Sequence, residues 1–399
     1  MDKTLPRRLT QAVLNNFYDR ERNCLREYAP VRADDRKDSY LWGYFAATGM
    51  LYHACRTEED LKPVYRGLLE GLLYYRSKPL KDGLVKYHSE RGDAPDGGHG
   101  PCFFDDNIWV ARNYLFAYET FGDAFYLAEA RRVAAYVYTG WNGALGGLVW
   151  NENGLTEHGT VQELERGLSA NACGSIVSAM LYRLTGEEGY LDWARQFYTF
   201  CKTVQDPVTK IYYNGVHTLL KDGKRLAGEV NKDLYSYNTG SMLLAGLYLY
   251  DVTRDEACYA DVLAAAKAAH EAFLCPATAE KPAYYTDFDW FMAILAEGYE
   301  ALAGYDKPAA KKYLKPFEDA LTYAAGHFMA ENGLLPHDHT KGWRRYKDQE
   351  GLTQDEWQKN NEYDRMLLTH SGTAEIAWIL AGQSGERLPQ RGRILPLAD

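Results

Sequence analysis

The sequence predicts an all-α fold, an (α/α)6 barrel of six helical hairpins in a single domain over residues 1–399. Three observations predict it. A short turn between two helical segments recurs five times, one helix of each pair is apolar almost all round while the other is amphipathic, and the connections between pairs are long. Two concentric rings of helices satisfy all three observations, because the inner ring is buried on every side.

The five turns place glycine or polar residues where one helix ends and acidic residues in the first turn of the next. Helix C-caps favour the former and the helix dipole favours the latter. The turns lie at residues 57–60, 121–123, 185–188, 253–256 and 304–306.

Reading outward from these turns gives about twelve helices. The segment 241–250 is apolar on all faces and typical of an inner helix, whereas 256–274 has one apolar and one charged face. No alternating strand pattern competes, so no substantial sheet is expected. The predicted pairs are 39–55 with 59–76, 105–121 with 124–140, 169–185 with 188–203, 236–253 with 256–274, 285–303 with 307–330, and 367–382 with 4–28.

The connections from outer to inner helices are long, near residues 77–104, 141–168, 204–235 and 331–366. Long loops within a compact domain usually carry function. They all fall where inner helices begin, so the binding face is expected at that end of the barrel.

Composition excludes several classes of partner. There are 45 Lys and Arg against 55 Asp and Glu, a formal charge of −10, and no basic patch, so nucleic acid is not an expected partner. The sequence has no secretory signal and no apolar stretch long enough to span a membrane. A cytoplasmic protein is expected, or an exported one if a leader has been removed. Seven cysteines without CxxC pairs indicate reduced thiols, and no cofactor is predicted.

The strongest local feature is a pair of adjacent acids, Asp105 and Asp106, at the mouth of a predicted inner helix. Phe103, Phe104 and Trp109 would surround them with apolar surface, which raises a carboxyl pKa, and the neighbouring charge raises one of them further. Two carboxyl groups with separated pKa values can serve as acid and base in glycoside hydrolysis. The alternative is a helix N-cap, a position that favours Asp but can hold only one of the two residues.

Around these acids the sequence resembles glycoside hydrolase family 76. Family members carry Asp-Asp-Asn-x-Trp at the start of an inner helix, followed by Tyr-Glu-x-x-Gly-Asp-x-x-Tyr-Leu and a Gly-Gly-x-x-Trp loop. The corresponding segments here are 105–109, 118–127 and 146–150, and 169–171 and 237–240 resemble the entrances to the next two inner helices.

The resemblance implies an (α/α)6 barrel and retaining hydrolysis of α-1,6-mannosidic linkages, with α-mannan or manno-oligosaccharides as substrate. It implies that Asp105 is the nucleophile and Asp106 the acid and base. Retention requires carboxyl groups roughly 5 Å apart. Departures from the family pattern at Thr239 and in the fifth inner helix leave the exact substrate, and endo or exo action, open.

Further residues are expected to contact sugar, the aromatic ones by stacking and the polar ones at the helix entrances. No metal site is predicted, because His337 and His339 lack an evident third ligand. The expected sugar contacts are Trp42, Phe104, Asn107, Trp109, Trp150, Asn171, Tyr237, Asn238, Asp289 and Trp290.

Two other functions remain open. One is a different (α/α)6 sugar enzyme, an N-acyl-sugar epimerase or an unsaturated-uronide hydrolase, for which His370 near the last inner helix is a candidate residue. The other is a carbohydrate-binding protein without activity. Isomerised free sugar would indicate the epimerase, and binding without turnover would indicate the binding protein.

Overall fold

A computed structural model describes residues 1–337, 339 and 362–382. This part of the chain contains twelve α-helices in two rings. The inner helices are α2 (Leu41–Cys55), α4 (Phe104–Phe121), α6 (Leu168–Thr185), α8 (Ser236–Thr253), α10 (Asp289–Leu302) and α14 (Leu367–Ala381). The outer helices are α1 (Leu5–Phe17), α3 (Lys62–Leu72), α5 (Ala124–Tyr138), α7 (Glu188–Lys202), α9 (Glu256–Phe273) and α11 (Lys307–His327).

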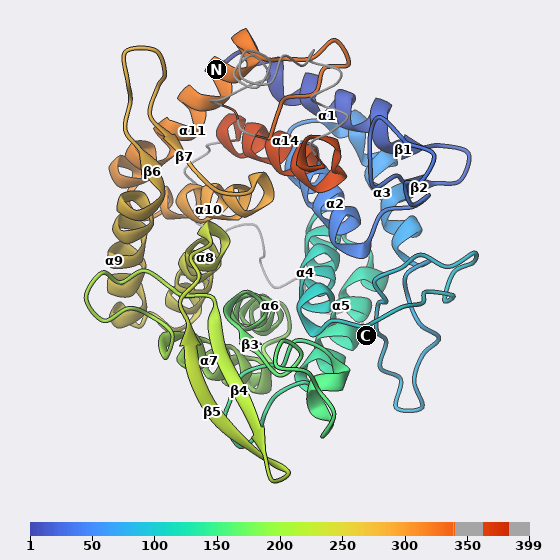
Figure 1. Cartoon of the computed structure of the whole chain (residues 1–399), viewed down its shortest axis with the longest axis vertical. Helices are drawn as coiled ribbons and strands as arrows, with labels where there is room; N and C mark the ends of the chain where they lie inside the picture. The colour runs from blue at the N-terminus through green and yellow to red at the C-terminus, as the bar shows by residue number, and fades with distance from the viewer. Residues whose placement is uncertain (338, 340–361, 383–399) are drawn as a thin grey trace.

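The inner helices form a closed ring. Each contacts the next in the order α2, α4, α6, α8, α10, α14, and α14 contacts α2 again (Figure 1). Every inner helix also packs against its own outer partner, and α1 supplies the partner of α14. The predicted (α/α)6 barrel is therefore confirmed, with helices from the two ends of the chain packed together.

The distribution of apolar residues explains which helix lies inside. In α8, both faces of the helix from Ser236 to Leu249 are buried almost without interruption. In α9, by contrast, buried residues such as Val262, Ala265 and Phe273 recur on one face only. An amphipathic helix can cover the ring but cannot enter it without burying its charges.

The tight turns are stabilised as their sequences predict. Gly122 and Gly186 adopt left-handed conformations at the ends of α4 and α6, with φ of 69° and 70°. The following helices then start with acidic caps, as where the side chain of Asp123 accepts the backbone N–H of Phe125.

One expectation was wrong. The helix predicted at 4–28 ends at Phe17, and the chain continues through a short hairpin of β1 (Tyr18–Asp19) and β2 (Cys24–Leu25). The largest sheet of the described residues is small and consists of β3 (Arg166–Gly167), β4 (Gly215–Lys221) and β5 (Lys224–Asn231). Asp222 and Gly223 join β4 to β5 with positive φ angles, the backbone of the tight turns that Asp-Gly favours.

The remaining elements are short. Strands β6 (Leu274–Cys275) and β7 (Tyr284–Tyr285) pair beside α11. Single turns of 3-10 helix are η1 (Glu59–Leu61), η2 (Glu152–Leu155) and η3 (Tyr363–Arg365).

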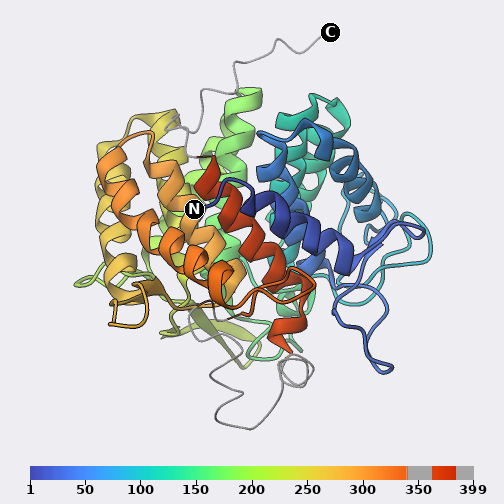
Figure 2. The same ribbon diagram turned by 90° about the horizontal axis from the view of Figure 1, so that it is seen from above.

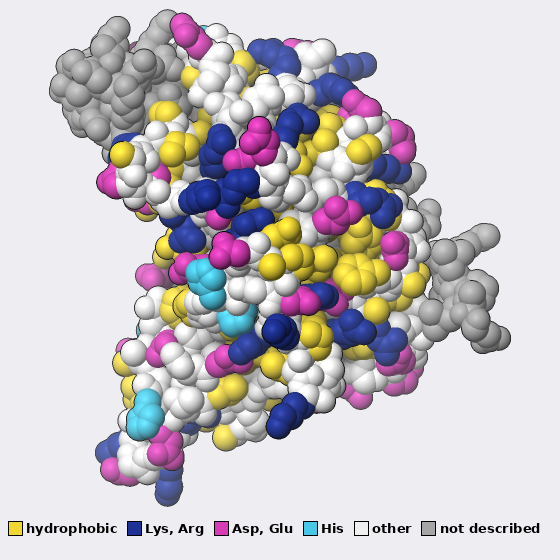
Figure 3. Space-filling view, turned by 90° about the vertical axis from the view of Figure 1, so that its right-hand side faces the viewer, with side chains coloured by type: hydrophobic (Ala, Val, Ile, Leu, Met, Phe, Trp, Pro, Cys, Tyr) yellow, Lys and Arg dark blue, Asp and Glu magenta, His cyan; other side chains and the backbone are white. Residues whose placement is uncertain are grey.

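The long connections and the tight turns lie at opposite ends of the barrel. In Figure 2 the β4–β5 hairpin lies beyond the ends of the helices, on the side where the inner helices begin. On the face shown in Figure 3, lysine and arginine side chains are interspersed with acidic ones, in keeping with the absence of a basic patch from the sequence. None of the described helices is long and apolar enough to cross a membrane. All seven cysteines lie in the described residues and are free.

Closure of the ring by α1 and α14 predicts that the protein unfolds as one unit, because neither chain end can detach without exposing an inner helix. Far-UV circular dichroism and tryptophan fluorescence should therefore give coincident thermal transitions. Two separate transitions would contradict the expectation of a single domain.

Candidate active site

A cleft opens at the end of the barrel where the inner helices begin. Its main cavity has a volume of about 550 Å³, and a second cavity of about 310 Å³ adjoins it. The two cavities share the lining residues Asp105, Trp150, Ser169, Tyr237 and Phe291. The adjacent acids of the sequence motif thus lie where the two parts of the cleft meet, at the face expected from the long loops.

The acids lie in the first turn of α4 but do not cap it. The N-cap residue is Phe103, in an extended conformation and with no side-chain capping bond, and Asp105 and Asp106 follow one and two residues after the first helical residue, Phe104. Both carboxyl groups instead line the main cavity. The N-cap alternative is therefore wrong, and both acids are available to a ligand.

The loop before α6 holds Trp150 against this turn. The backbone N–H of Phe104 donates to the carbonyl of Trp150 at 2.9 Å, and the rings of Phe103 and Trp150 are 4.7 Å apart. The side chain of Trp150 hydrogen-bonds to Asp105. Trp150 therefore connects the loop directly to one of the two acids.

The glycine pair of the same loop is required by its geometry. Gly146 and Gly147 both have positive φ angles, 73° and 81°. A Cβ atom on Gly147 would lie 2.6 Å from the ring of Phe200. Only glycine allows the loop to turn here without displacing that ring.

The two carboxyl groups have separated pKa values. Burial raises the pKa of Asp105 to about 6, and the hydrogen bond from Trp150 opposes that rise. Burial and the adjacent charge of Asp105 raise the pKa of Asp106 well above its usual range. Near neutral pH the pair therefore holds one proton, on Asp106, while Asp105 is ionised.

Three inner helices bind the preceding loop through one repeated contact. The side chain of the fourth helical residue accepts a backbone N–H from the loop that returns to the barrel. Asn107 accepts from Tyr87 at 2.7 Å, Asn171 from Leu148 at 2.9 Å, and Thr239 from Tyr212 at 3.4 Å. These buried side chains fix the loops that form the cleft, and we refer to them as the loop clasps.

Part of the predicted sugar-binding set does not line the cleft, including two of the loop clasps. Asn107 and Asn171 are fully buried and bond to backbone, so neither reaches the cleft. Asn238 and Phe104 are also fully buried. The amide of Asn238 donates to the side chain of Asn214, and Phe104 packs against Tyr136. Sequence position placed these residues at helix entrances correctly, but their side chains point into the protein.

Asp289 is a further correction. Its carboxylate is completely buried and accepts the hydroxyl of Thr373 at 3.0 Å, while His339 lies 2.9 Å from the same oxygen and His337 hydrogen-bonds to the other. It therefore ties the loop before α14 to the barrel instead of lining the cleft. Asp338, between the two histidines, lies outside the described residues.

Apart from Phe104, the predicted aromatic residues line the main cavity, in two ways. Trp109 and Trp290 are only 3% and 4% exposed and form its floor, with ring centroids 5.1 Å apart. Trp42 is 36% exposed, and Trp150 and Tyr237 are partly exposed, so these three present faces on which a sugar ring can stack.

Sequence reasoning missed three acids of the main cavity, Glu27, Glu90 and Glu362. Glu27 is buried, accepts the backbone N–H of Tyr40, and has its pKa raised to about 7 by burial. These acids come from loops far apart in the sequence and carry no local signal. Within the described lining there is no Lys, Arg or His, so this cavity favours neutral ligands over anionic ones.

Comparison with known proteins agrees with this arrangement. The family model described as Glycosyl hydrolase family 76 matches residues 6–365. No curated protein sequence matches the chain.

Solved structures of similar fold include members of the same family. A family 76 glycoside hydrolase (mannosidase), Bt3792 from Bacteroides thetaiotaomicron, is 23% identical, with a TM-score of 0.78 over 95% of this chain and 97% of that one. The GH76A α-1,6-mannanase of Salegentibacter sp. is 17% identical, with a TM-score of 0.71 over 96% and 99%. An inactive variant of that enzyme, with two consecutive aspartates replaced by asparagine, is in complex with α-1,6-mannotriose.

The clasps predict a long-range effect on the cleft. Replacing Asn171 by Ala leaves the N–H of Leu148 without its partner, which should lower the free energy of unfolding by about 1–3 kcal/mol. Because Leu148 lies two residues before Trp150, the variant should also bind ligand more weakly. Denaturant unfolding and ligand titration by tryptophan fluorescence measure the two effects, and unchanged values in both would contradict the clasp.

Proposed function

The chain belongs to glycosyl hydrolase family 76, and we propose that it hydrolyses α-1,6-mannosidic linkages in mannan or manno-oligosaccharides with retention of configuration. One observation carries the proposal. Asp105 and Asp106 both line the cleft, and their environments separate an ionised carboxylate from a protonated one. Retaining glycosidases require this combination of nucleophile and acid.

The environments assign the roles. Asp105 accepts a hydrogen bond from Trp150, which favours its ionised form, so Asp105 is the nucleophile. No such hydrogen bond lowers the pKa of Asp106, and the charge of Asp105 favours its protonated form. Asp106 is therefore the general acid in the first step.

The reaction then takes two displacements. A carboxylate oxygen of Asp105 attacks the anomeric carbon, the glycosidic bond breaks, and the leaving oxygen takes the proton of Asp106. In the second step Asp106 removes a proton from water, whose oxygen attacks the anomeric carbon as the bond to Asp105 breaks. The second step regenerates both acids and restores the original anomeric configuration.

A neutral hexose polymer suits the cleft. Aromatic faces at Trp42, Trp150 and Tyr237 suit the apolar faces of sugar rings, and the carboxylates suit sugar hydroxyls. The α-1,6 linkage is supported by the mannotriose complex of the Salegentibacter enzyme and by the motif resemblance.

The alternative enzymes are less well supported. An unsaturated-uronide hydrolase has to bind a carboxylate, whereas the described cavity lining holds five acids and no base. His370, the candidate residue of an epimerase, is 2% exposed and bonds to the backbone carbonyl of Asp364, away from the cleft lining. A binding protein without activity would not require an ionised and a protonated carboxyl side by side.

The two-part cleft favours cleavage within a chain. Because the cavities of about 550 and 310 Å³ meet at Asp105, sugar units can lie on both sides of the reacting bond. We expect α-1,6-mannotetraose to yield disaccharide early in the reaction. Mannose and mannotriose as the early products, measured by chromatography, would indicate exo action instead.

Substitution of the acids tests the assignment directly. Asp105→Asn and Asp106→Asn should each lower turnover of α-1,6-manno-oligosaccharides by about 10²–10⁴-fold or more, with the fold unchanged by circular dichroism. Asp123→Asn, at the cap of α5 on the opposite end of the barrel, is the control and should retain turnover. Near-normal turnover in either active-site variant would refute the proposed pair.

The two roles can be separated with an activated mannoside whose leaving group needs no proton. Asp106→Ala should regain much of the rate of the first step with this substrate, because the general acid is then not needed. Asp105→Ala should gain nothing, since the nucleophile is still missing. The reverse pattern would exchange the roles, and β-mannose as the first product by proton NMR would indicate inversion.

The pH dependence follows from the same pair. Activity requires Asp105 ionised and Asp106 protonated, so kcat/KM should rise as pH increases through about 6 and fall again at higher pH. The alkaline fall should disappear when the activated mannoside is used. A rate that stays constant between acid and neutral pH would contradict the shifted ionisation of the pair.

A further inference from the structure

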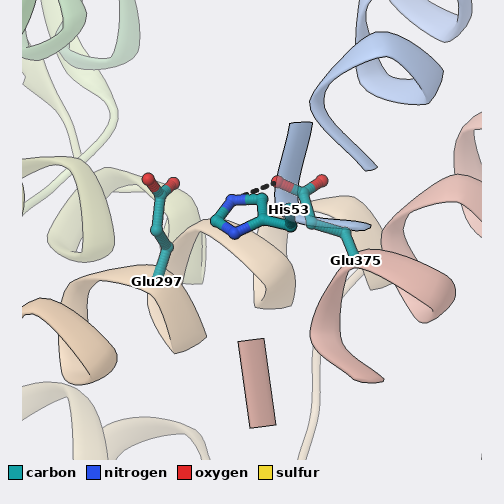
Figure 4. Close-up of side chains that lie close together, drawn as sticks. All are labelled: His53, Glu297 and Glu375. Carbon is teal, nitrogen blue, oxygen red and sulfur yellow. Dashed lines mark ion pairs between the residues drawn. The ribbon is translucent and has the colours of Figure 1, made fainter. Parts of the chain in front are cut away.

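A second group of ionisable side chains lies inside the barrel, beneath the cleft. His53 from α2, Glu297 from α10 and Glu375 from α14 converge there, with the imidazole of His53 between the two carboxyl groups (Figure 4). None of the three lines the main cavity of the cleft. We refer to these three residues as the axial cluster.

An aromatic layer separates the axial cluster from the catalytic acids. Arg112, which contacts the cluster through Glu297, lies seven residues after Asp105 on α4, a rise of about 10 Å. The floor rings of Trp109 and Trp290 lie between these levels of the barrel, and the guanidinium of Arg112 is 5.2 Å from the ring of Trp109. The axial cluster therefore does not take part in the proposed reaction.

The axial cluster contains buried polar atoms without partners. His53, Glu297 and Glu375 are 3%, 6% and 2% exposed. Within the described residues, no hydrogen-bond partner reaches Glu297 Oε2 or Glu375 Oε2, and His53 Nε2 has only a 3.5 Å ion-pair contact with Glu375 Oε1, the dashed line in Figure 4. Buried polar atoms are nearly always satisfied, so a group that bonds to all three residues is the expected reason for their convergence.

The three residues form a ligand set for a metal ion. One ligand atom from each lies within 4.8 Å of the others, so small side-chain shifts would bring all three to coordination distance of a central ion. One imidazole nitrogen with two carboxylates suits divalent ions such as Zn²⁺ or Mn²⁺.

The neighbouring arginines are compatible with a cation. Arg112 pairs with one oxygen of Glu297 and leaves the other open. Arg56 makes two bonds to Glu300, at 2.8 and 3.2 Å, and only a 3.4 Å contact to Nδ1 of His53. In this structure Nδ1 accepts this contact, so Nε2 carries the proton and faces Glu375 Oε1 at 3.5 Å. An ion at Nε2 requires the proton to move to Nδ1, with Arg56 bonded to Glu300 alone.

We propose that the axial cluster binds one divalent transition-metal ion through His53, Glu297 and Glu375, and that the ion is structural. The site joins α2, near the start of the chain, to α10 and α14, near its end. These helices are adjacent in the ring, at the point where α14 meets α2 to close it. An ion bound here would link the ends of the chain and stabilise the closed barrel.

Metal content and refolding test the site. The protein is produced in medium containing Zn²⁺ and Mn²⁺ and purified without chelator. Inductively coupled plasma mass spectrometry should then find about one equivalent of metal per chain. After unfolding in guanidinium with a chelator, refolding with Zn²⁺ or Mn²⁺ should give a melting temperature several degrees above that of the protein refolded without metal.

Two variants locate the effect. Glu375→Gln keeps the size of the side chain but loses a ligand charge, so it should lose the bound metal and the metal-dependent shift. Glu129→Gln is the matched control, because Glu129 is equally buried but pairs with Arg76 and Arg132, and it should keep both. Metal below about 0.1 equivalent in the unmodified protein with no shift on refolding, or full metal in Glu375→Gln, would overturn the proposal. Absence of metal with no shift on refolding would indicate that shared protons, and not an ion, join the residues of the axial cluster.

Discussion

One repeated hydrogen bond holds the cleft in shape. Asn107, Asn171 and Thr239 each extend from the first turn of an inner helix to the backbone of the loop that precedes it. Without these contacts the loops would leave buried N–H groups unpaired, which costs free energy that a few surface contacts cannot offset. The position of Trp150, and through it the ionisation of Asp105, depends on a loop anchored in this way.

Two opposing effects act on the pKa values of the acids in the first turn of α4. A helix N-terminus favours negative charge and so lowers a carboxyl pKa, but this effect is modest. Burial among aromatic rings favours the neutral form and is the larger influence at both residues. The helix therefore positions the pair, while the aromatic walls and the bond from Trp150 decide which member keeps the proton.

Sequence patterns predicted the barrel well, because inner and outer helices differ in the periodicity of their apolar residues. The helix bounds agree within a few residues except at 4–28, where α1 ends at Phe17 and the charged segment that follows forms the β1–β2 hairpin. The β4–β5 hairpin was missed although Asp222 and Gly223 form its turn, because β5 has no buried residue and neither strand alternates clearly between buried and exposed positions.

The pair of acids in the cleft was predictable because its motif is local, and the rest of the cleft was not. A motif gives the position of Asn107 or Asn171 at a helix entrance but not the direction of its side chain, and both proved to be loop clasps. Glu27, Glu90 and Glu362 come from three separate loops, so only the folded chain brings them together. Local motifs thus identify chemistry, whereas the walls of a cleft depend on contacts between distant segments.

The barrel contains two sets of paired carboxyl groups, and access separates their roles. Asp105 and Asp106 face a cleft that a sugar can enter, so their shared proton can be transferred to a substrate. Glu297 and Glu375 also influence each other, since burial and the charge of Glu297 raise the pKa of Glu375 well above its usual range. They lie outside the lining of the cleft, on either side of the imidazole of His53. Similar side chains are therefore proposed to serve catalysis on one side of the Trp109 and Trp290 floor and stability on the other.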